Sequence, residues 1–272
     1  MNRLFVAYKP PFISSNGFLS RLKRKYGVKS AGFSGSLDPF AKGALIVAFG
    51  SYTKLFNYIA KTPKRYRATL WLGAHSDSLD IERVTRIDQA PRLTLGAIEA
   101  VFARFAGEIE QYPPIFSAIK INGERAYRLA RKGEQAPIKP RKVTIYDLKL
   151  IAYERPFLTF EAAVSEGCYI RSLGSDIAAN FGCAGSLSFL ERLSEGRLRF
   201  ENERSLNPLE FINLPRNQYL GDHSDLYLGR RLSVNNFAVC ADGDYLIESE
   251  GFFTIVRIFD GAATYKLGRR DM

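Results

Sequence analysis

One carboxylate in a loop is the first residue whose type and setting could do chemistry. Asp38 lies in the stretch Gly35-Ser36-Leu37-Asp38-Pro39, where glycine frees the backbone and proline stiffens the exit. In a poorly hydrated cleft such a carboxylate can act as a nucleophile or as a general base. An Asp-Pro pair is also an ordinary turn, because the aspartate side chain bonds its own backbone. Asp38 alone therefore decides nothing.

The composition of the chain limits which other residue types could do chemistry. The three cysteines, Cys168, Cys183 and Cys240, form no CxxC pair, which argues against a disulfide framework and a zinc site. The two histidines, His75 and His223, are too few for a His-rich metal centre and argue against a His-based triad. Chemistry must therefore use carboxylates, tyrosines, arginines or lysines, and no metal or cofactor is expected.

The charge of the chain points to its partner. The net charge is +11 and the pI is about 9.6, a surplus that favours a polyanion such as nucleic acid. Residues 117–142 carry eight Lys or Arg against two Glu, and further basic blocks cover 21–29 and 61–67. Any single block could be a solvated helix face. Three blocks interleaved with Tyr26, Tyr66 and Tyr127 favour phosphate contacts and base stacking.

The elements that must position these residues alternate without regular order. Strands are predicted over 4–8, 44–49, 66–72 and 157–165, the third with Tyr66, Ala68, Leu70 and Leu72 on one face. A helix capped by Ser15 or Asn16 carries Phe18, Leu19, Leu22 and Tyr26 inward, and one capped by Thr94 buries Leu95, Ile98, Phe102 and Phe105. The segment from residue 166 starts extended and becomes helical near Ser172. This mixture predicts an α+β fold with a mixed, largely antiparallel central sheet flanked by helices and loops.

The end of the chain has a different sequence pattern. Asp-Gly turns between short β-rich runs predict a small all-β appendix over about 220–272, and residues 1–212 are predicted to form the main domain. The N-terminus lacks an apolar signal region, and the sequence has no apolar run of eighteen residues. A cytoplasmic protein with no membrane association is expected.

Four ordered segments are more specific than any one of them: YKPPFISSN (8–16), GFSGSLDPFAKGAL (32–45), KRYRATLWLGAHSDSLD (64–80) and GCYIRSLGSDI (167–177). Together they resemble the TruB family of bacterial tRNA pseudouridine synthases, over about residues 3–200. The resemblance implies the pseudouridine synthase fold and an RNA-clamping insertion at about 114–142. Many family members end in an RNA-binding PUA domain, so a reduced or divergent version is expected at 220–272.

The resemblance also implies a catalytic group of three residues. Asp38 matches the aspartate used in cleaving the N1–C1′ bond of one uridine before the uracil is rejoined through C5. Arg171 matches an arginine that pairs with this carboxylate, and Tyr66 a tyrosine that stacks on the uracil and is placed to move a proton. Tyr169 is expected to point the same way as Arg171, because both are predicted in an extended segment.

Further residues are implied to bind substrate. The glycines on either side of Phe33 and Ser34, Gly32 and Gly35, allow the loop backbone close to a nucleotide. Lys9 packs beside the cleft and could support Tyr66, and Asp77, with Asp80, matches an acidic pair. Phe33 stands where the family usually has histidine, and its ring is expected to fill the space of a flipped nucleotide. Phosphate contacts are assigned to the basic insertion, through Lys120, Arg128, Arg131 and Lys132.

The resulting hypothesis is an RNA isomerase that makes pseudouridine at position 55 in the T-loop of tRNA. The target base must be extruded from the stem-loop, and basic and aromatic contacts offset that cost. The alternatives are a synthase for another RNA and an RNA-binding or tRNA-folding module without catalysis. A glycoside hydrolase would need two carboxylates across a sugar, and the loop offers one. No protein partner is implied.

Overall fold

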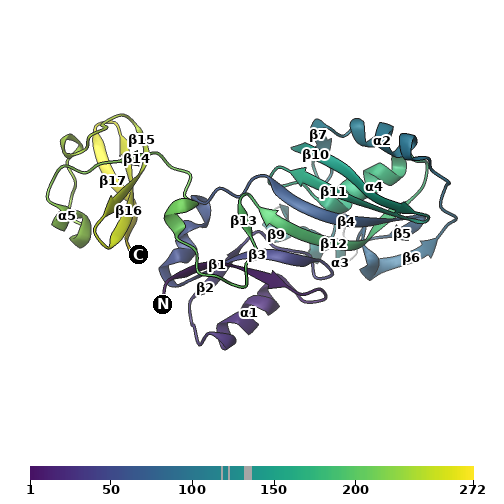
Figure 1. Cartoon of the computed structure of the whole chain (residues 1–272), viewed down its shortest axis with the longest axis horizontal. Coiled ribbons are helices and arrows are strands. Elements are labelled where there is room, and N and C mark those ends of the chain that lie inside the picture. Colours follow the sequence, from purple (N-terminus) through teal and green to yellow (C-terminus); the bar gives the residue numbers. More distant parts are fainter. Residues whose placement is uncertain (118, 122, 132–136) are drawn as a thin grey trace.

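The main body is built around one large sheet. The structure is a computed structural model, and it describes residues 1–117, 119–121, 123–131 and 137–272. The nine-stranded sheet has the order β1-β3-β12-β4-β11-β10-β7, with β2 added beside β3 and β13 beside β12 (Figure 1). Its strands are β1 (Arg3–Lys9), β2 (Ala31–Ser34), β3 (Lys42–Phe49), β4 (Lys64–Leu72), β7 (Gly107–Gln111), β10 (Arg141–Glu154), β11 (Phe157–Val164), β12 (Gly185–Glu195) and β13 (Leu198–Arg199). Among these strands only the β3–β12 pair is parallel, so the predicted α+β fold is confirmed.

Side chains of the central strand β4 alternate between a buried face and an outer face of the sheet. Tyr66, Ala68, Leu70 and Leu72 are buried, whereas the alternate residues are more exposed, as the period of two predicts. The buried face is covered by helices α2 (Leu95–Ala103) and α4 (Ile170–Asn180), which complete the largest core cluster. Tyr66 therefore points to the side of the sheet that carries α4.

The two predicted helix caps have different outcomes. In α2, Thr94 caps the helix by accepting a hydrogen bond from the amide of Ala97 at 3.2 Å, as predicted. Leu95, predicted to be buried, is 61% exposed, because the first turn of α2 (residues 94–97) extends beyond the core on which Ile98 packs. In α1 (Ser15–Lys25), the cap is Ser14 and not the predicted Ser15 or Asn16. Helix α1 buries Phe18 and Leu22 against β1 and β3.

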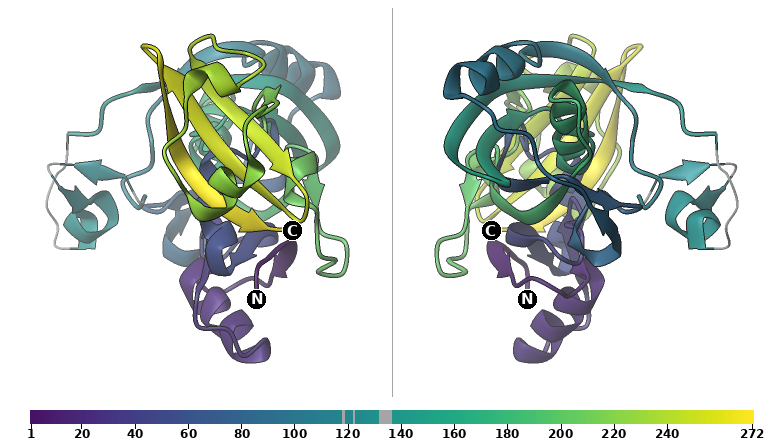
Figure 2. Two further views of the ribbon diagram at one scale, coloured as in Figure 1. Left: turned by 90° about the vertical axis from the view of Figure 1, so that its left-hand side faces the viewer. Right: turned by 90° about the vertical axis from the view of Figure 1, so that its right-hand side faces the viewer.

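Several short elements surround the main sheet. The hairpin of β5 (Ala74–Ser76) and β6 (Val84–Ile87) encloses the 3-10 helix η2 (Ile81–Arg83), and a second 3-10 helix, η1 (Gly50–Asn57), follows β3. The predicted insertion contains β8 (Lys120–Ile121), β9 (Glu124–Arg125) and α3 (Ala126–Arg131). Figure 2 shows this teal segment standing away from the body of the molecule.

The end of the chain forms a separate four-stranded sheet in the order β14-β15-β16-β17. Its strands are β14 (Arg216–Asn217), β15 (Gly243–Ser249), β16 (Phe252–Phe259) and β17 (Ala262–Asp271). The Asp260-Gly261 turn joins β16 to β17 with φ of +49° and +67°, which confirms this predicted hairpin. The sequence did not predict helix α5 (His223–Leu228) or the 3-10 helices η3 (Pro208–Glu210) and η4 (Val234–Asn236).

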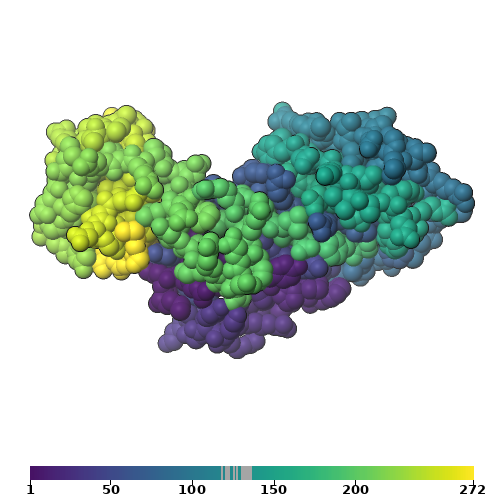
Figure 3. Space-filling model, in the orientation of Figure 1, coloured from purple at the N-terminus to yellow at the C-terminus, as the bar shows by residue number. Residues whose placement is uncertain are grey.

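The two sheets share one hydrophobic cluster. Leu4 and Ile46 of the large sheet pack in the same cluster as Phe253 and Leu267 of the small one. Tyr52 adds a hydrogen bond from its hydroxyl to the carbonyl of Asp271 at 2.8 Å. The space-filling view shows the small sheet and its loops as a lobe at one end of an elongated molecule (Figure 3). In the part of the chain that the structure describes, no helix is long and apolar enough to cross a membrane.

Candidate active site

Arg171 and Asp38 meet in a two-pronged ion pair, although they lie far apart in the sequence. The Nε atom of Arg171 donates to Oδ2 of Asp38 at 2.8 Å, and Nη2 donates to Oδ1 at 2.9 Å. The Arg171 side chain is 3% exposed and that of Asp38 is 33% exposed. A planar guanidinium can make this fork, whereas a lysine ammonium cannot. The carboxylate is thus oriented at the edge of the cleft.

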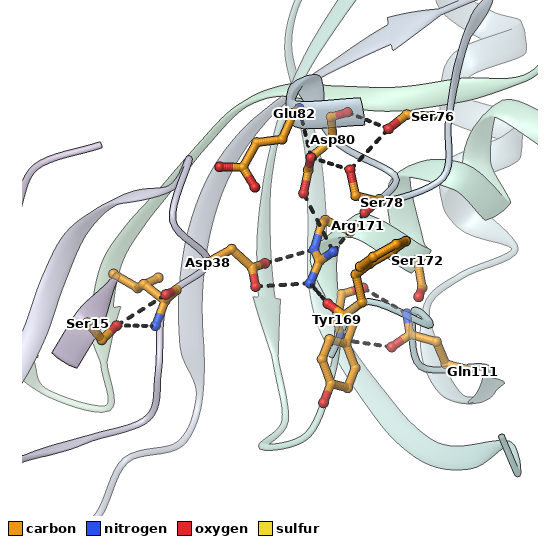
Figure 4. A network of polar contacts seen from close by, with 12 residues as sticks. Ser15, Asp38, Ser76, Ser78, Asp80, Glu82, Gln111, Tyr169, Arg171 and Ser172 are labelled. Atoms are coloured by element: carbon orange, nitrogen blue, oxygen red, sulfur yellow. Dashed lines mark hydrogen bonds and ion pairs between the residues drawn. The ribbon is translucent and has the colours of Figure 1, made fainter. Parts of the chain in front are cut away.

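The remaining donors of Arg171 fix the guanidinium itself. Nη1 donates to the carbonyl of Ser78 at 2.7 Å and Nη2 to the carbonyl of Phe116 at 2.9 Å. A carboxylate oxygen of Asp80 lies 3.5 Å from Nη1, and Asp80 accepts a hydrogen bond from the Ser78 hydroxyl at 2.6 Å (Figure 4). Two separate segments, residues 78–80 and the one that contains Phe116, therefore hold one guanidinium against Asp38.

The loop is held on both sides of Asp38. The Ser15 hydroxyl accepts a hydrogen bond from the Leu37 amide at 2.9 Å and donates one to the Leu37 carbonyl at 3.1 Å. The Lys9 amino group donates to the carbonyl of Pro39 at 3.2 Å. Ser15 is the first residue of α1, and Ser14 before it is the cap. The residues before and after Asp38 are thus both fixed.

Lys9 packs beside the Asp38 loop and is fully buried there. It is 0% exposed, and its amino group also donates to the carbonyls of Pro10 at 2.9 Å and Ile13 at 2.7 Å. Burial lowers the pKa of Lys9 to about 8, although the nearby Asp38 carboxylate opposes this shift. With three carbonyl partners and no exposed surface, Lys9 braces the loop, and these contacts do not support the predicted contact with substrate.

The first turn of α4 separates Tyr169 from Arg171. The helix begins at Ile170, two residues before the predicted start, and Tyr169 is its N-cap. Gln111 holds this cap with both amide atoms: Oε1 accepts from the Tyr169 amide at 2.8 Å and Nε2 donates to the Tyr169 carbonyl at 3.1 Å. A helix turns by about 100° per residue, so the prediction that both side chains point the same way is wrong.

Asp38 lies between two cavities. One, of about 810 Å³, is lined by Arg171, Asp80, Glu82, Arg83 and Phe116. The other, of about 540 Å³, is lined by Tyr66, Tyr169, Lys64 and Arg192. Asp38 lines both, so it shares one cavity with Arg171 and the other with Tyr66. Asp38 is thus the residue that the cavity of Arg171 and the cavity of Tyr66 have in common.

The charges of the site act on Asp38 in opposite directions. Burial raises the pKa of Asp38, and the Asp80 carboxylate adds to this increase. The charge and hydrogen bonds of Arg171 oppose the increase. Burial also raises the pKa of Tyr66, while the cations of Arg192 and Lys64 oppose that shift. The site therefore holds a carboxylate of raised basicity beside a neutral phenol.

Of the other residues predicted to contact substrate, some line the cavities beside Asp38 and others do not. Gly35 lines the 540 Å³ cavity with a positive φ of +63°, which a side chain rarely adopts, whereas Ser34 is buried. Phe33 lines neither cavity, because β2 turns its ring toward the cluster around α1, so its prediction as a space filler is not supported. Asp77 is exposed and lines a different pocket, because it sits at the outer turn of the β5–β6 hairpin. Of the acidic pair, Asp80 is the one at the site.

The basic insertion lies on the protruding segment. Lys120 is in β8, while Arg128 and Arg131 are in α3, and Arg128 is exposed. Lys132 lies outside the described residues. Phe116, at the base of this segment, contributes the carbonyl that Arg171 binds. The segment predicted to bind phosphate is thus attached directly to the polar network.

Sequence reasoning missed three positioning residues. The sequence predicts Ser15 only as a helix cap, gives no role to Gln111, and favours Asp77 over Asp80 as a substrate contact. In the structure Asp80 caps the 3-10 helix η2 by accepting a hydrogen bond from the Glu82 amide at 2.9 Å, a role that aspartate often has at helix starts. Gln111 lies at the end of β7, and only the fold brings it to Tyr169.

Comparisons with known proteins give one family match and several similar proteins. Residues 23–170 match the TruB family pseudouridylate synthase N-terminal domain. The tRNA pseudouridine synthase B of Sulfurovum sp. (strain NBC37-1) is 52% identical over 269 residues, covering 99% of this chain and 97% of that protein. The protein of the same name from Sulfurimonas denitrificans is 51% identical over 270 residues, covering 99% of each chain. That from Campylobacter jejuni (strain RM1221) is 46% identical, covering 99% of this chain and 98% of the other.

Solved structures share the fold. A chain in the crystal structure of a Cbf5-Nop10-Gar1 complex superposes with a TM-score of 0.68 at 19% identity, covering 99% of this chain and 84% of that one. A chain in an H/ACA RNP bound to a substrate RNA containing 2′-deoxyuridine gives 0.66 at 18% identity, again covering 99% and 84%. These likenesses extend over both sheets.

Proposed function

The chain belongs to the TruB family of pseudouridylate synthases, and from this premise we propose that it isomerises uridine 55 in the T-loop of tRNA. Pseudouridine synthases are isomerases, so the enzyme class follows from the family. The observation that carries the proposal is the Asp38–Arg171 fork, whose carboxylate also lines the cavity that Tyr66 lines. Because the substrate is tRNA, we place the reaction in the cytoplasm.

The roles assigned to the site follow from what each side chain can do. Asp38 supplies an ionised carboxylate to the sugar or the base, and Arg171 keeps that carboxylate charged and oriented. Tyr66 stacks on the detached uracil, and its neutral phenol can take part in the proton movement at C5. Lys9 and Ser15 hold the loop, so that Asp38 does not have to be ordered when the nucleotide enters.

The nucleotide must leave its stem-loop to reach Asp38. Extrusion costs a few kcal/mol of unstacking. We propose that exposed cations of the insertion, including Arg128, contact the phosphates of the T-arm and offset this cost. The two cavities on either side of Asp38 give room for the extruded nucleotide and its neighbour.

One experiment tests the function. Purified protein is incubated with full-length tRNA and with a T-arm stem-loop, and pseudouridine is mapped by chemical adduct formation and primer extension. Asp38→Asn serves as the matched variant, because it keeps the shape of the side chain and removes its charge; we expect it to bind RNA and to lose at least about 1000-fold in rate. Wild-type protein that binds tRNA and modifies no uridine would instead mark a binding or folding module. Modification only of another RNA would reassign the substrate.

A further inference from the structure

Arg192 is a buried arginine outside the Asp38–Arg171 network. Its side chain is 1% exposed, and it donates from Nε to the carbonyl of Ala44 at 2.8 Å and from Nη2 to the carbonyl of Gly35 at 2.9 Å. Gly35 comes just before the loop segment that carries Asp38, and Ala44 comes just after it. One side chain therefore ties together the two ends of this loop.

The backbone of Arg192 lies between the same two parts of the site. In the large sheet, Arg192 is paired with Tyr66 of β4 on one side and with Gly43 of β3 on the other. Gly43 has φ of +115°, and a Cβ placed there would lie 2.3 Å from the carbonyl oxygen of Arg192. This close approach fixes the exit of the loop against β12. Arg192 is thus the direct link between the Asp38 loop and the strand of Tyr66.

A buried carboxylate completes the cluster. Glu195 is 0% exposed, and its two oxygens lie 3.0 Å from Nη2 of Arg192 and 3.3 Å from Nζ of Lys64. Gly35 rests on this group: a Cβ there would lie 3.0 Å from Glu195 and 3.1 Å from Lys64. Two cations thus share one carboxylate directly beneath the start of the loop.

The cost of such a cluster indicates its role. Removing three charges from water is expensive, and apolar side chains of similar volume are often at least as stabilising. Stability alone therefore does not account for Arg192, Glu195 and Lys64. What an apolar cluster could not supply is the pair of directed hydrogen bonds to Gly35 and Ala44, which set where the loop lies.

We propose that Arg192, supported by Glu195 and Lys64, is a positioning residue that fixes the Asp38 loop relative to Tyr66. Arg171 orients the carboxylate from the side of the 810 Å³ cavity, and Arg192 sets the distance between that carboxylate and the phenol across the other cavity. A displacement of about 1 Å at a reacting group can cost about 100-fold in rate. This inference rests on the proposed function, since both groups must act on the same nucleotide.

The test uses Arg192→Lys, which keeps the charge beside Glu195 and loses the guanidinium that donates to both Gly35 and Ala44. Hydrogen exchange of the amides between residues 35 and 44 measures the hold on the loop without reference to activity. We expect exchange there to become about tenfold faster, the single-turnover rate on tRNA to fall at least about 30-fold, and the Kd for tRNA to stay within about threefold. Leu55→Ala, a buried residue of the cluster shared by the two sheets, is the control for a general loss of stability.

Each outcome bears on the proposal. Exchange and rate like those of wild type, or losses no larger than those of Leu55→Ala, would overturn it. If Arg192→Lys does not fold, Glu195→Gln decides, because it leaves Arg192 in place without its counter-charge and should loosen the loop in the same direction. Wild-type protein that makes no pseudouridine would remove the proposed function, while loop exchange in the variants would still test whether Arg192 holds the loop.

Discussion

Arg171 faces Asp38 edge to edge, with Nε and Nη2 of the guanidinium opposite the two carboxylate oxygens at 2.8 and 2.9 Å. The same guanidinium reaches two backbone carbonyls and a second carboxylate, that of Asp80. Asp38 is therefore oriented by a group that is itself fixed by the fold, and several consequences can be measured.

Arg171→Lys should reduce turnover far more than binding. Lysine keeps the charge and cannot make the fork or reach both carbonyls, so we expect the single-turnover rate to fall at least about 100-fold while the Kd for tRNA changes less than about threefold. The control is Arg83→Lys, an exposed arginine on the wall of the same cavity, which should keep most of its rate. Equal losses of rate and affinity in Arg171→Lys would mean that Arg171 binds RNA instead of orienting Asp38.

The rate should have an acid limb set by Asp38. The active form is the carboxylate, so the rate is lost as the pH falls through the pKa of Asp38, which burial raises above its usual value of 3.8. Asp80 adds to this increase by like-charge repulsion, and Asp80→Asn should therefore move the limb to lower pH. A pH profile of the single-turnover rate measures the acid limb of the wild type and that of Asp80→Asn. A limb that moves to higher pH in Asp80→Asn would contradict this account of the charges.

As the pH rises, deprotonation of Lys9 should lower the rate, while the contribution of Lys9 to stability should increase. Above its pKa of about 8 the amine keeps two donors for three carbonyls, so the loop loosens and the rate falls. The folded-state pKa is below the unfolded value of 10.5, so the unfolded chain binds more protons between these pH values. The Lys9 contribution to stability therefore rises with pH across this window. Differences between wild type and Lys9→Met in rate and in denaturant midpoint from pH 7 to 10 test the two signs, and parallel trends would refute them.

The insertion should contribute phosphate contacts. Replacing Lys120, Arg128, Arg131 and Lys132 by alanine should weaken tRNA binding and flatten its dependence on salt by up to about four counterions, because each phosphate contact releases counterions. A control with the same charge change replaces Arg65, Arg67, Lys149 and Arg155, which are exposed on the outer face of the sheet or its end turn. Filter binding across a salt series compares the two. An unchanged slope in the insertion variant would mean that this segment does not bind the backbone.

Much of the fold could be predicted where pattern and packing agree. The alternation of β4 gave the buried face that carries Tyr66, and the Asp260-Gly261 pair gave the terminal hairpin. The start of α4 could not be predicted, because the cap at Tyr169 is held by Gln111, which lies far away in the sequence. Leu95 fits the apolar stripe of α2, but only the position of the helix end shows that its first turn lies beyond the core.

The site was predicted in part for a similar reason. Sequence motifs pointed to Asp38 and Arg171, and the structure brings them into contact. Motifs do not state what a side chain touches, so Lys9 was grouped with the substrate-binding residues although its three donors bind backbone. Ser15 and Arg192 act through carbonyls of the Asp38 loop and its ends, and such contacts leave no residue pattern that a single sequence could reveal.

The hydrophobic cluster shared by the two sheets limits how far the chain can be shortened. Deleting the strands after Asn217 would remove Phe253 and Leu267, the apolar neighbours of Leu4 and Ile46. Apolar surface would then be exposed on the strands next to the Asp38 loop. The terminal sheet is therefore no detachable module. A truncated enzyme built to isolate the chemistry would be prone to self-association before its catalysis could be assessed.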